Sequence, residues 1–262
     1  MRGPTASLRN NVVIKTLAKL ARKYLKWYNN SSYKRDKNGE TWLLGRLRAE
    51  LRTVLDVGAN VGTWALFAEQ ILPDAVIHAV EIVPATRERL AANTAGHARI
   101  RCASIGLSDR DGRVSVRYHP TYSNLATVTE YPHHWKDELV ECAVTTGDAF
   151  LRGEGLDRVD FLKLDVEGAE HLVLRGFAEA LAAKRVRFVQ FEYGKVNILT
   201  KFLLRDFHEL FAGYGYVVGK IFPDFVDFRN YDLADEDFVG PNYLACAAGD
   251  PARALLGLQR GR

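Results

Sequence analysis

Acidic side chains follow four short apolar segments of the sequence, at positions where their carboxylates could do chemistry. Asp56 closes "VLD" before the glycine-rich "VGANVG", and Glu81 follows "IHAV" 25 residues later. Asp165 follows "VDFLKL", and Glu192 follows "VRFVQF". Carboxylates can hold an ammonium group or ribose hydroxyls, bind a hard cation such as Mg²⁺, or accept a proton as a general base. The chemistry therefore depends on whether the fold brings these four acids together.

The elements between the acids alternate between apolar strands and helical patterns. Strands are expected at 53–57, 76–80, 100–103, 159–164, 186–191, 216–221 and 243–247. Helices are expected at 62–72, from Pro84, from about Ala169, and at about 202–211. This alternation predicts an α/β, Rossmann-like doubly wound fold, with a mostly parallel sheet and helices on both faces. Ligands in such sheets bind beyond the carboxyl ends of the strands, where the four acids should gather.

The turn after the first strand favours a cationic ligand. Gly58 and Gly62 permit a close approach of the backbone and angles closed to other residues. A dinucleotide fingerprint G-x-G-x-x-G fails at Asn60 and Thr63, and Asp56 would stand near a pyrophosphate. A nucleoside that carries an ammonium and a sulfonium fits this turn better than one that carries phosphates. The alternative is that Asp56 caps the turn and Glu81 is a solvated strand end.

Several segments resemble one known family. "LDVGANVG", "VEIVP", "GLSDRDG" and "LKLDVEGAEHLVLRG" are similar to the FkbM family of S-adenosylmethionine-dependent methyltransferases. The resemblance runs from about Val54 to Gly176 and continues more weakly to about Ala247. It implies a seven-stranded sheet with an antiparallel hairpin at its last strands. It also implies S-adenosylmethionine as cofactor and O-methylation, often of a sugar or natural-product hydroxyl.

The resemblance assigns cofactor-binding residues position by position. Asp56, Gly58 and Asn60 would line the methionine end of the cofactor, and Glu81 would bind the ribose. The adenine would lie near Ile82, Ser108 and Asp109. For the last two, "SDRDG" also has strong turn chemistry of its own.

A hydroxyl acceptor must lose a proton, which calls for a general base or a metal. Asp165 and Glu192 are the first candidates, and Asp165 could instead hold the methionine ammonium. The two acids together could hold Mg²⁺, a hypothesis that we do not favour. His134, beside His133 in an aromatic stretch, is a further candidate base.

Other acids and histidines near these segments have plainer explanations. Glu167 and Glu170 could simply favour a helix N-terminus through its dipole. His171 is expected on the surface of the same helix. None of the three is assigned a role in catalysis.

The basic charge of the chain is concentrated at one end. Residues 1–52 hold thirteen Lys and Arg against three acids, whereas the rest holds 23 against 29. The pattern of residues 12–28 predicts an amphipathic basic helix, followed by a polar linker at 29–40. This helix could pack on the main domain, lie on a membrane surface, or form a dimer interface.

These observations divide the chain into an arm and linker at 1–45, a methyltransferase domain at 46–250 and a tail at 251–262. An insert with a hairpin is expected at about 107–145. The acceptor is expected to be a small molecule or glycan, and no nucleic acid is expected because no RNA-binding module is recognisable and the domain is acidic. A nucleic-acid methyltransferase and a non-catalytic binding protein are the alternatives.

Composition and leader signals bear on the compartment. No apolar run approaches eighteen residues, and no apolar signal core lies near Met1. The three cysteines form no CxxC pair. We therefore expect a cytoplasmic protein, with peripheral membrane contact through the basic helix as an open alternative.

Overall fold

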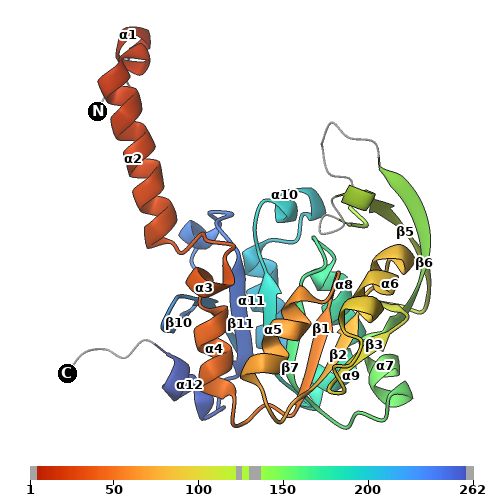
Figure 1. Ribbon diagram of the computed structural model, residues 1–262. Helices are drawn as coiled ribbons and strands as arrows, with labels where there is room; N and C mark the ends of the chain where they lie inside the picture. Colours follow the sequence, from red (N-terminus) through yellow and green to blue (C-terminus); the bar gives the residue numbers. More distant parts are fainter. Residues whose placement is uncertain (1–4, 122–125, 130–136, 258–262) are drawn as a thin grey trace.

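Figure 1 shows the computed structural model, which describes residues 5–121, 126–129 and 137–257. A large sheet forms the centre and has helices on both faces. Its strands are β1 (Thr53–Val57), β2 (Val76–Val80), β3 (Ile100–Ala103), β7 (Val159–Leu164), β8 (Val186–Glu192), β9 (Tyr216–Ile221), β10 (Val226–Phe228) and β11 (Asn242–Ala247).

The helices of the described residues are mostly short. They are α1 (Ala6–Asn10), α2 (Val12–Tyr28), α3 (Arg35–Asn38), α4 (Glu40–Leu47), α5 (Thr63–Ile71), α6 (Pro84–Asn93), α7 (Gly147–Gly153), α8 (Glu170–Gly176), α9 (Ala178–Ala182), α10 (Val196–Thr200), α11 (Leu204–Gly213) and α12 (Ala252–Leu256). A 3₁₀ turn spans Leu233–Asp235.

The strand order of the large sheet is β10-β9-β11-β8-β7-β1-β2-β3. Neighbours from β8 to β3 are parallel, whereas β11 runs antiparallel to both β8 and β9. The predicted doubly wound fold is confirmed, with the antiparallel pair at its last strands. One detail differs, because β10 adds an eighth strand at the edge. Its three residues are too few to form a recognisable sequence pattern.

The continuous apolar runs of the central strands follow from burial on both faces. Phe161 and Leu162 are adjacent in β7, and neither side chain is exposed. Phe161 packs in the core cluster that contains Trp64 and Leu44, whereas Leu162 packs in the cluster on the other face. Side chains of a strand alternate between faces, so a strand covered on both sides needs no polar positions.

The predicted insert forms a second, smaller sheet. Its order is β4-β6-β5, with β4 at Gly106–Ser108, β5 at Gly112–Tyr118 and β6 at Glu138–Thr146. β5 and β6 form the expected antiparallel hairpin, and β4 pairs with β6 in parallel. In Figure 1 this sheet lies at the β3 side of the large sheet.

The N-terminal residues divide differently from the expectation. α4 lies inside the domain, because Leu43, Leu44 and Leu47 are fully buried in the core. The segment predicted to be a polar linker contains α3 and the buried side chains of Asn30 and Asn38. The sequence-based boundary at residue 46 therefore falls within a packed helix.

The basic helix predicted at residues 12–28 is present as α2, with the same bounds. Packing on the main domain was one of the three arrangements considered for it. Figure 1 shows the helix projecting away from the sheet domain. None of its residues is buried. The expectation that it packs on the main domain is wrong, because the helix projects from the domain and none of its side chains is buried. Throughout the described part of the chain, no helix has both the length and the apolar character needed to cross a bilayer.

Candidate active site

The carboxyl ends of β1, β7 and β8 border a pocket of about 190 Å³. Asp56 of β1 is in register with Lys163 of β7, so these strands end side by side. The pocket is lined by Tyr33, Arg35, Asn38, Glu40, Gly58, Ala59, Asn60, Thr63, Trp64, Lys163, Asp165, Glu192 and Pro241. The structure thus brings four of the sequence-predicted site residues together: Gly58, Asn60, Asp165 and Glu192.

The turn after β1 needs glycine for close packing against β7. Gly58 has φ +83°, and a Cβ at this position would lie 1.9 Å from the carbonyl oxygen of Asp165. The glycine therefore allows the turn to approach the end of β7, which positions Asp165 at the pocket. Asn60 follows in the left-handed region at φ 48°.

Glu81 supports this turn from beneath. Its carboxylate accepts hydrogen bonds from the backbone N–H of Asn60 and of Val83, each at 2.9 Å. Only 5% of Glu81 is exposed, so the interpretation as a solvated strand end is wrong. Burial raises the pKa of Glu81, and the two N–H donors oppose this rise.

Lys163 joins two of the predicted acids. Its Nζ lies 3.3 Å from Oδ1 of Asp56 and 3.0 Å from Oδ2 of Asp165. Burial alone would lower the pKa of Lys163, but the charges of Asp165 and Asp56 outweigh burial and raise it. The ammonium therefore stays charged. The other oxygen of Asp56, Oδ2, is buried with no hydrogen-bond partner in the described residues.

The remaining acids at this edge have raised pKa values. Burial raises the pKa of Glu192 well above its ordinary value, and the charges of Asp165 and Glu167 add to this. Burial and Asp165 raise the pKa of Glu167 to about 8. A general base works best with a pKa near the working pH, so this cluster is suited to proton transfer.

Glu170 is a buried loop anchor as well as the first residue of α8. Burial raises its pKa to about 7. Its Oε1 accepts the N–H groups of Val166 and Gly168, at 3.1 and 3.3 Å. Glu170 therefore holds the loop between β7 and α8, in addition to favouring the helix N-terminus.

The pocket wall contributed by residues 33–40 was missed by the sequence interpretation. The carboxylate of Glu40 is buried and accepts hydrogen bonds from Trp64 Nε1, Gln190 Nε2 and Asn38 Nδ2 at 3.0, 2.8 and 2.8 Å. Arg35 donates to the carbonyl of Thr63 at 3.0 Å. The one available signal was an acid directly before the apolar "TWLLGRL", where a helix begins on the core.

The other predicted cofactor residues lie outside this pocket. Asp56 does not line the pocket and is fully buried. Ile82 packs against Gly106, where an added Cβ would lie 2.5 Å from Ile82 Cδ1. Ser108 Oγ donates to Oδ1 of Asp109 at 3.2 Å. The cofactor roles of these residues stay predictions.

His133, His134 and His171 are the three histidines that the sequence places near these segments. His133 and the candidate base His134 lie outside the described residues. His171 is not the surface residue that was expected, because it is partly buried and stacks on Phe202 with ring centroids 4.8 Å apart. Burial lowers the pKa of His171.

Metal ligation was the alternative use of the acids. Within residues 5–121, 126–129 and 137–257, no group of three or more His, Cys, Asp or Glu side chains is arranged to hold a metal ion. The Mg²⁺ hypothesis therefore depends on experiment.

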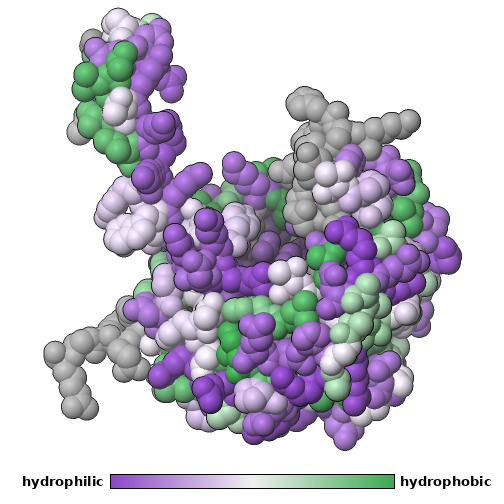
Figure 2. All heavy atoms as spheres, viewed as in Figure 1, coloured by the Kyte–Doolittle hydropathy of each residue, from purple (hydrophilic) through white to green (hydrophobic). Residues whose placement is uncertain are grey.

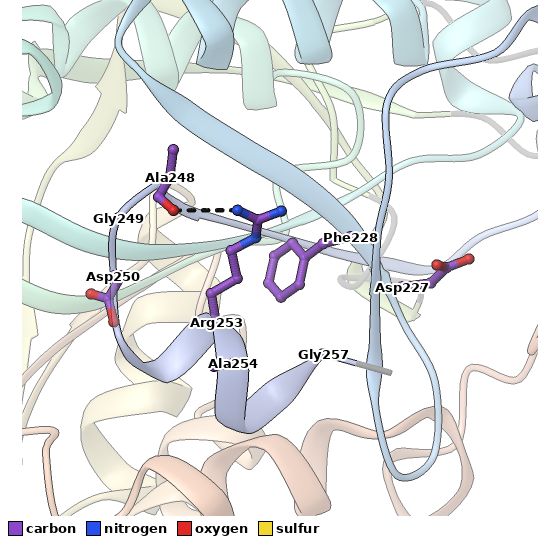
Figure 3. A pocket seen from close by; sticks show the side chains of 8 residues that line it. All are labelled: Asp227, Phe228, Ala248, Gly249, Asp250, Arg253, Ala254 and Gly257. Atoms are coloured by element: carbon purple, nitrogen blue, oxygen red, sulfur yellow. Dashed lines mark hydrogen bonds between the residues drawn. The ribbon is translucent and has the colours of Figure 1, made fainter. Parts of the chain in front are cut away.

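A larger pocket of about 460 Å³ lies away from these acids, between β10, the end of β11 and α12. Figure 3 shows its lining, in which Arg253 donates to the carbonyl of Ala248 at 3.3 Å. Asp250 is engaged by Arg187 at 2.7 Å. The charged groups of this pocket are thus paired with the protein, and it is remote from the carboxyl ends of the parallel strands.

Comparison with known proteins decides the family. The model of the methyltransferase FkbM domain matches residues 56–218, which is more than half of the chain. The chain belongs to the FkbM methyltransferase family. The matched FkbM region begins at Asp56 and includes Asp165 and Glu192, so the strand-end acids belong to the family domain.

Two curated relatives are methyltransferases by name. Methyltransferase sdnD of Sordaria araneosa is 30% identical over 159 residues, which cover 48% of this chain and 60% of sdnD. The 2-O-methyltransferase NoeI of Sinorhizobium fredii is 27% identical over 155 residues, which cover 53% of this chain and 62% of NoeI. The chain thus spans less than two thirds of the length of either relative.

Among solved structures, the O-methyltransferase TomG of Streptomyces achromogenes, in complex with SAM, is 15% identical to this chain. The match has a TM-score of 0.44 and covers 80% of each chain.

Proposed function

We propose that this FkbM protein is an S-adenosylmethionine-dependent O-methyltransferase that acts on a hydroxyl of a sugar, glycan or natural product. The observation that carries the proposal is the convergence of Asp165 and Glu192 with the Gly58 turn on one pocket. The similarity to NoeI, a 2-O-methyltransferase, supports a hydroxyl acceptor.

The pocket has the charges that a zwitterionic amino-acid group requires. Bound S-adenosylmethionine would supply an electrophilic methyl group on a sulfonium. Asp165 would hold the ammonium of its methionine end, and the Arg35 guanidinium would face the carboxylate. The unpaired Oδ2 of Asp56 beneath the pocket adds negative potential that favours a cation. A volume of about 190 Å³ suits this end of the cofactor rather than the whole molecule.

Glu192 is the better candidate for the base. Oδ2 of Asp165 is engaged by the Lys163 ammonium at 3.0 Å, so this carboxylate is already paired with a cation. The raised pKa of Glu192 makes its carboxylate the stronger proton acceptor. In the proposed reaction Glu192 would accept the proton of the acceptor hydroxyl as its oxygen takes the methyl group that bound S-adenosylmethionine would supply, and the cofactor would leave as a neutral thioether. Glu192 then releases the proton to solvent.

The test has two stages. Isothermal titration should show binding of S-adenosylmethionine and of its demethylated product, and no binding of NAD. Transfer of a labelled methyl group to a panel of sugars and natural-product alcohols should then identify the acceptor. Tight binding of NAD without binding of S-adenosylmethionine would overturn the proposal. Cofactor binding without transfer to any hydroxyl would favour a non-catalytic protein.

A further inference from the structure

The N-terminal helix α2 exposes apolar side chains that the described domain leaves uncovered. Leu17 and Leu20 are each 57% exposed, and Trp27 is 74% exposed. These side chains lie on a helix of 17 residues that projects from the domain (Figure 1). Exposed apolar surface of this extent is uncommon on a monomer and marks a docking face.

The two faces of α2 are sharply separated. At 3.6 residues per turn, its five bases fall within an arc of about 100°, and its large apolar residues other than Val12 fill the opposite arc of about 160°. The bases are Lys15, Lys19, Arg22, Lys23 and Lys26. Figure 2 shows the same division as a hydrophobic side and a hydrophilic side of the arm.

The charge of the arm selects among the surfaces that could cover it. Residues 1–35 contain nine Lys and Arg and no acid. Two copies of α2 packed through their apolar faces would double this positive charge and supply no compensating carboxylate, which disfavours a self-paired helix. An anionic surface satisfies both faces, because apolar side chains enter it while lysine stems extend to its headgroups.

Aromatic residues gather at the end of α2 nearest the domain. Tyr24 packs on Trp27 with ring centroids 5.8 Å apart and on Tyr28 at 6.1 Å. All three are more than half exposed. Tyr and Trp rings, with an apolar body and a polar tip, favour the boundary between headgroups and acyl chains.

We propose that α2 docks the protein on an anionic lipid bilayer, lying in the plane of its surface. The anchor to the domain is short. Asn30, two residues after the helix, donates its side-chain amide to the carbonyls of Asn38 and Ile221 at 2.9 and 2.8 Å. Tyr33 and Arg35, just beyond, line the pocket. Docking thus places the pocket wall within a few residues of the lipid surface.

Docking on a membrane also indicates the class of acceptor, an inference that rests on the proposed methyl transfer. A pocket held at a bilayer surface receives a hydroxyl carried on a lipid or lipid-linked glycan in preference to a freely diffusing one. Membrane binding itself requires no methyl transfer. The docking and the acceptor class can therefore be refuted independently of each other.

Co-sedimentation of the full chain with vesicles tests the docking. Vesicles of phosphatidylcholine with about a third phosphatidylserine should bind the protein, pure phosphatidylcholine should not, and salt should release it as the charges are screened. Reversing Lys19 and Lys23 to Glu should weaken binding about 30-fold or more, since each base near the surface contributes about fivefold. The matched control reverses Arg89 and Lys201, which are exposed elsewhere, and should leave binding unchanged.

The apolar face is tested in the same assay. The double variant Leu17→Glu and Leu20→Glu should lose vesicle binding, whereas Leu139→Glu with Leu233→Glu, also at exposed leucines, should keep it. Because α2 contributes no buried residue and both Leu139 and Leu233 are exposed, the two variants should retain the wild-type melting temperature. Absence of binding to anionic vesicles, or binding that ignores salt, would overturn the docking. A different result would assign the apolar face to self-association. In that case the wild-type protein would not bind vesicles and would have the mass of two chains in solution, and the Leu17 and Leu20 variant would have the mass of one.

The acceptor class has its own readout. Methyl transfer should be faster to a glycolipid in anionic vesicles than to the same headgroup free in solution, and the Leu17 and Leu20 variant should lose this advantage while it retains the rate on the free headgroup. Equal rates for both forms with intact vesicle binding would overturn the acceptor class and leave the docking in place.

Discussion

Replacing Glu192 with Gln removes a proton acceptor from the pocket and keeps the size of the side chain. A positioned general base contributes about 10²- to 10⁴-fold to a rate. We therefore expect kcat to fall by about 10²-fold or more, which is roughly 2.7 kcal/mol of activation free energy. KM for the cofactor should change little, because the base acts on the acceptor in the transition state.

The fold should survive this change. Glu192 is partly buried beside Asp165, Glu167 and Glu170, and burial together with the charges of these acids raises its pKa. A neutral amide avoids this repulsion, so the melting temperature of the variant should equal or exceed that of the wild type. Far-UV circular dichroism and thermal unfolding check this before kinetics are compared.

The pH profile gives the sharper measurement. Since the carboxylate must be ionised to accept a proton, kcat should rise with pH and level off once the pH exceeds the pKa of Glu192. Asp165→Asn removes a neighbouring negative charge that, after burial, contributes most to this raised pKa, so the rise should move to lower pH. Initial rates over a pH series, at saturating cofactor and acceptor, provide the comparison. A Glu192→Gln enzyme with kcat within about threefold of wild type would refute the assignment, given the scale of general base catalysis.

EDTA separates the metal alternative from the base. If Asp165 and Glu192 hold Mg²⁺, EDTA should abolish activity and Mg²⁺ should restore it. We expect full activity in EDTA, with Glu192 acting without metal. If activity survives both EDTA and the Gln variant, His133 and His134 are the next residues to replace.

Three further predictions concern the turn, the cofactor and stability. Gly58→Ala places a Cβ 1.9 Å from a carbonyl oxygen at φ +83° and should cost about 2 kcal/mol or more in thermal unfolding. Gly45→Ala, in α4 with no atom within 4 Å of the added Cβ, should be neutral or gain about 0.5–1 kcal/mol; equal losses would contradict the packing argument. Arg35→Gln should weaken titrated binding of S-adenosylmethionine by about 1–3 kcal/mol, with exposed Arg46→Gln unchanged as control, and wild-type affinity would remove Arg35 from the site. Burial raises the pKa of Glu170 to about 7 from 4.5, so the folded state holds a proton that the unfolded chain releases. Its contribution to stability is thus full below pH 4.5 and is lost as pH rises through about 7. Glu170→Gln should flatten this fall in melting temperature between pH 5 and 8, and an unchanged slope would be evidence against it.

The strands of the sheet could be predicted from the sequence because their cause is local. "VDFLKL" is apolar at four of its six positions, as is typical of a parallel strand covered on both faces, and β7 begins and ends where that segment does. The glycine-rich turn and the acids at the strand ends could be predicted for the same reason, because they directly follow these apolar segments in the sequence. β10 could not be predicted, since three residues at a sheet edge carry no such pattern.

Tertiary structure decided which residues share the pocket. Glu40 lines the pocket and accepts a hydrogen bond from Gln190, which is 150 residues away in the sequence. No local pattern in a polar segment indicates such a partner. The raised pKa of Glu192 likewise depends on burial and on acids from a different strand. The amphipathic pattern of α2 predicted a helix with an apolar face, but only the structure showed that the described domain does not cover it. Periodicity is a property of one segment, whereas burial and charge environment depend on what packs opposite it.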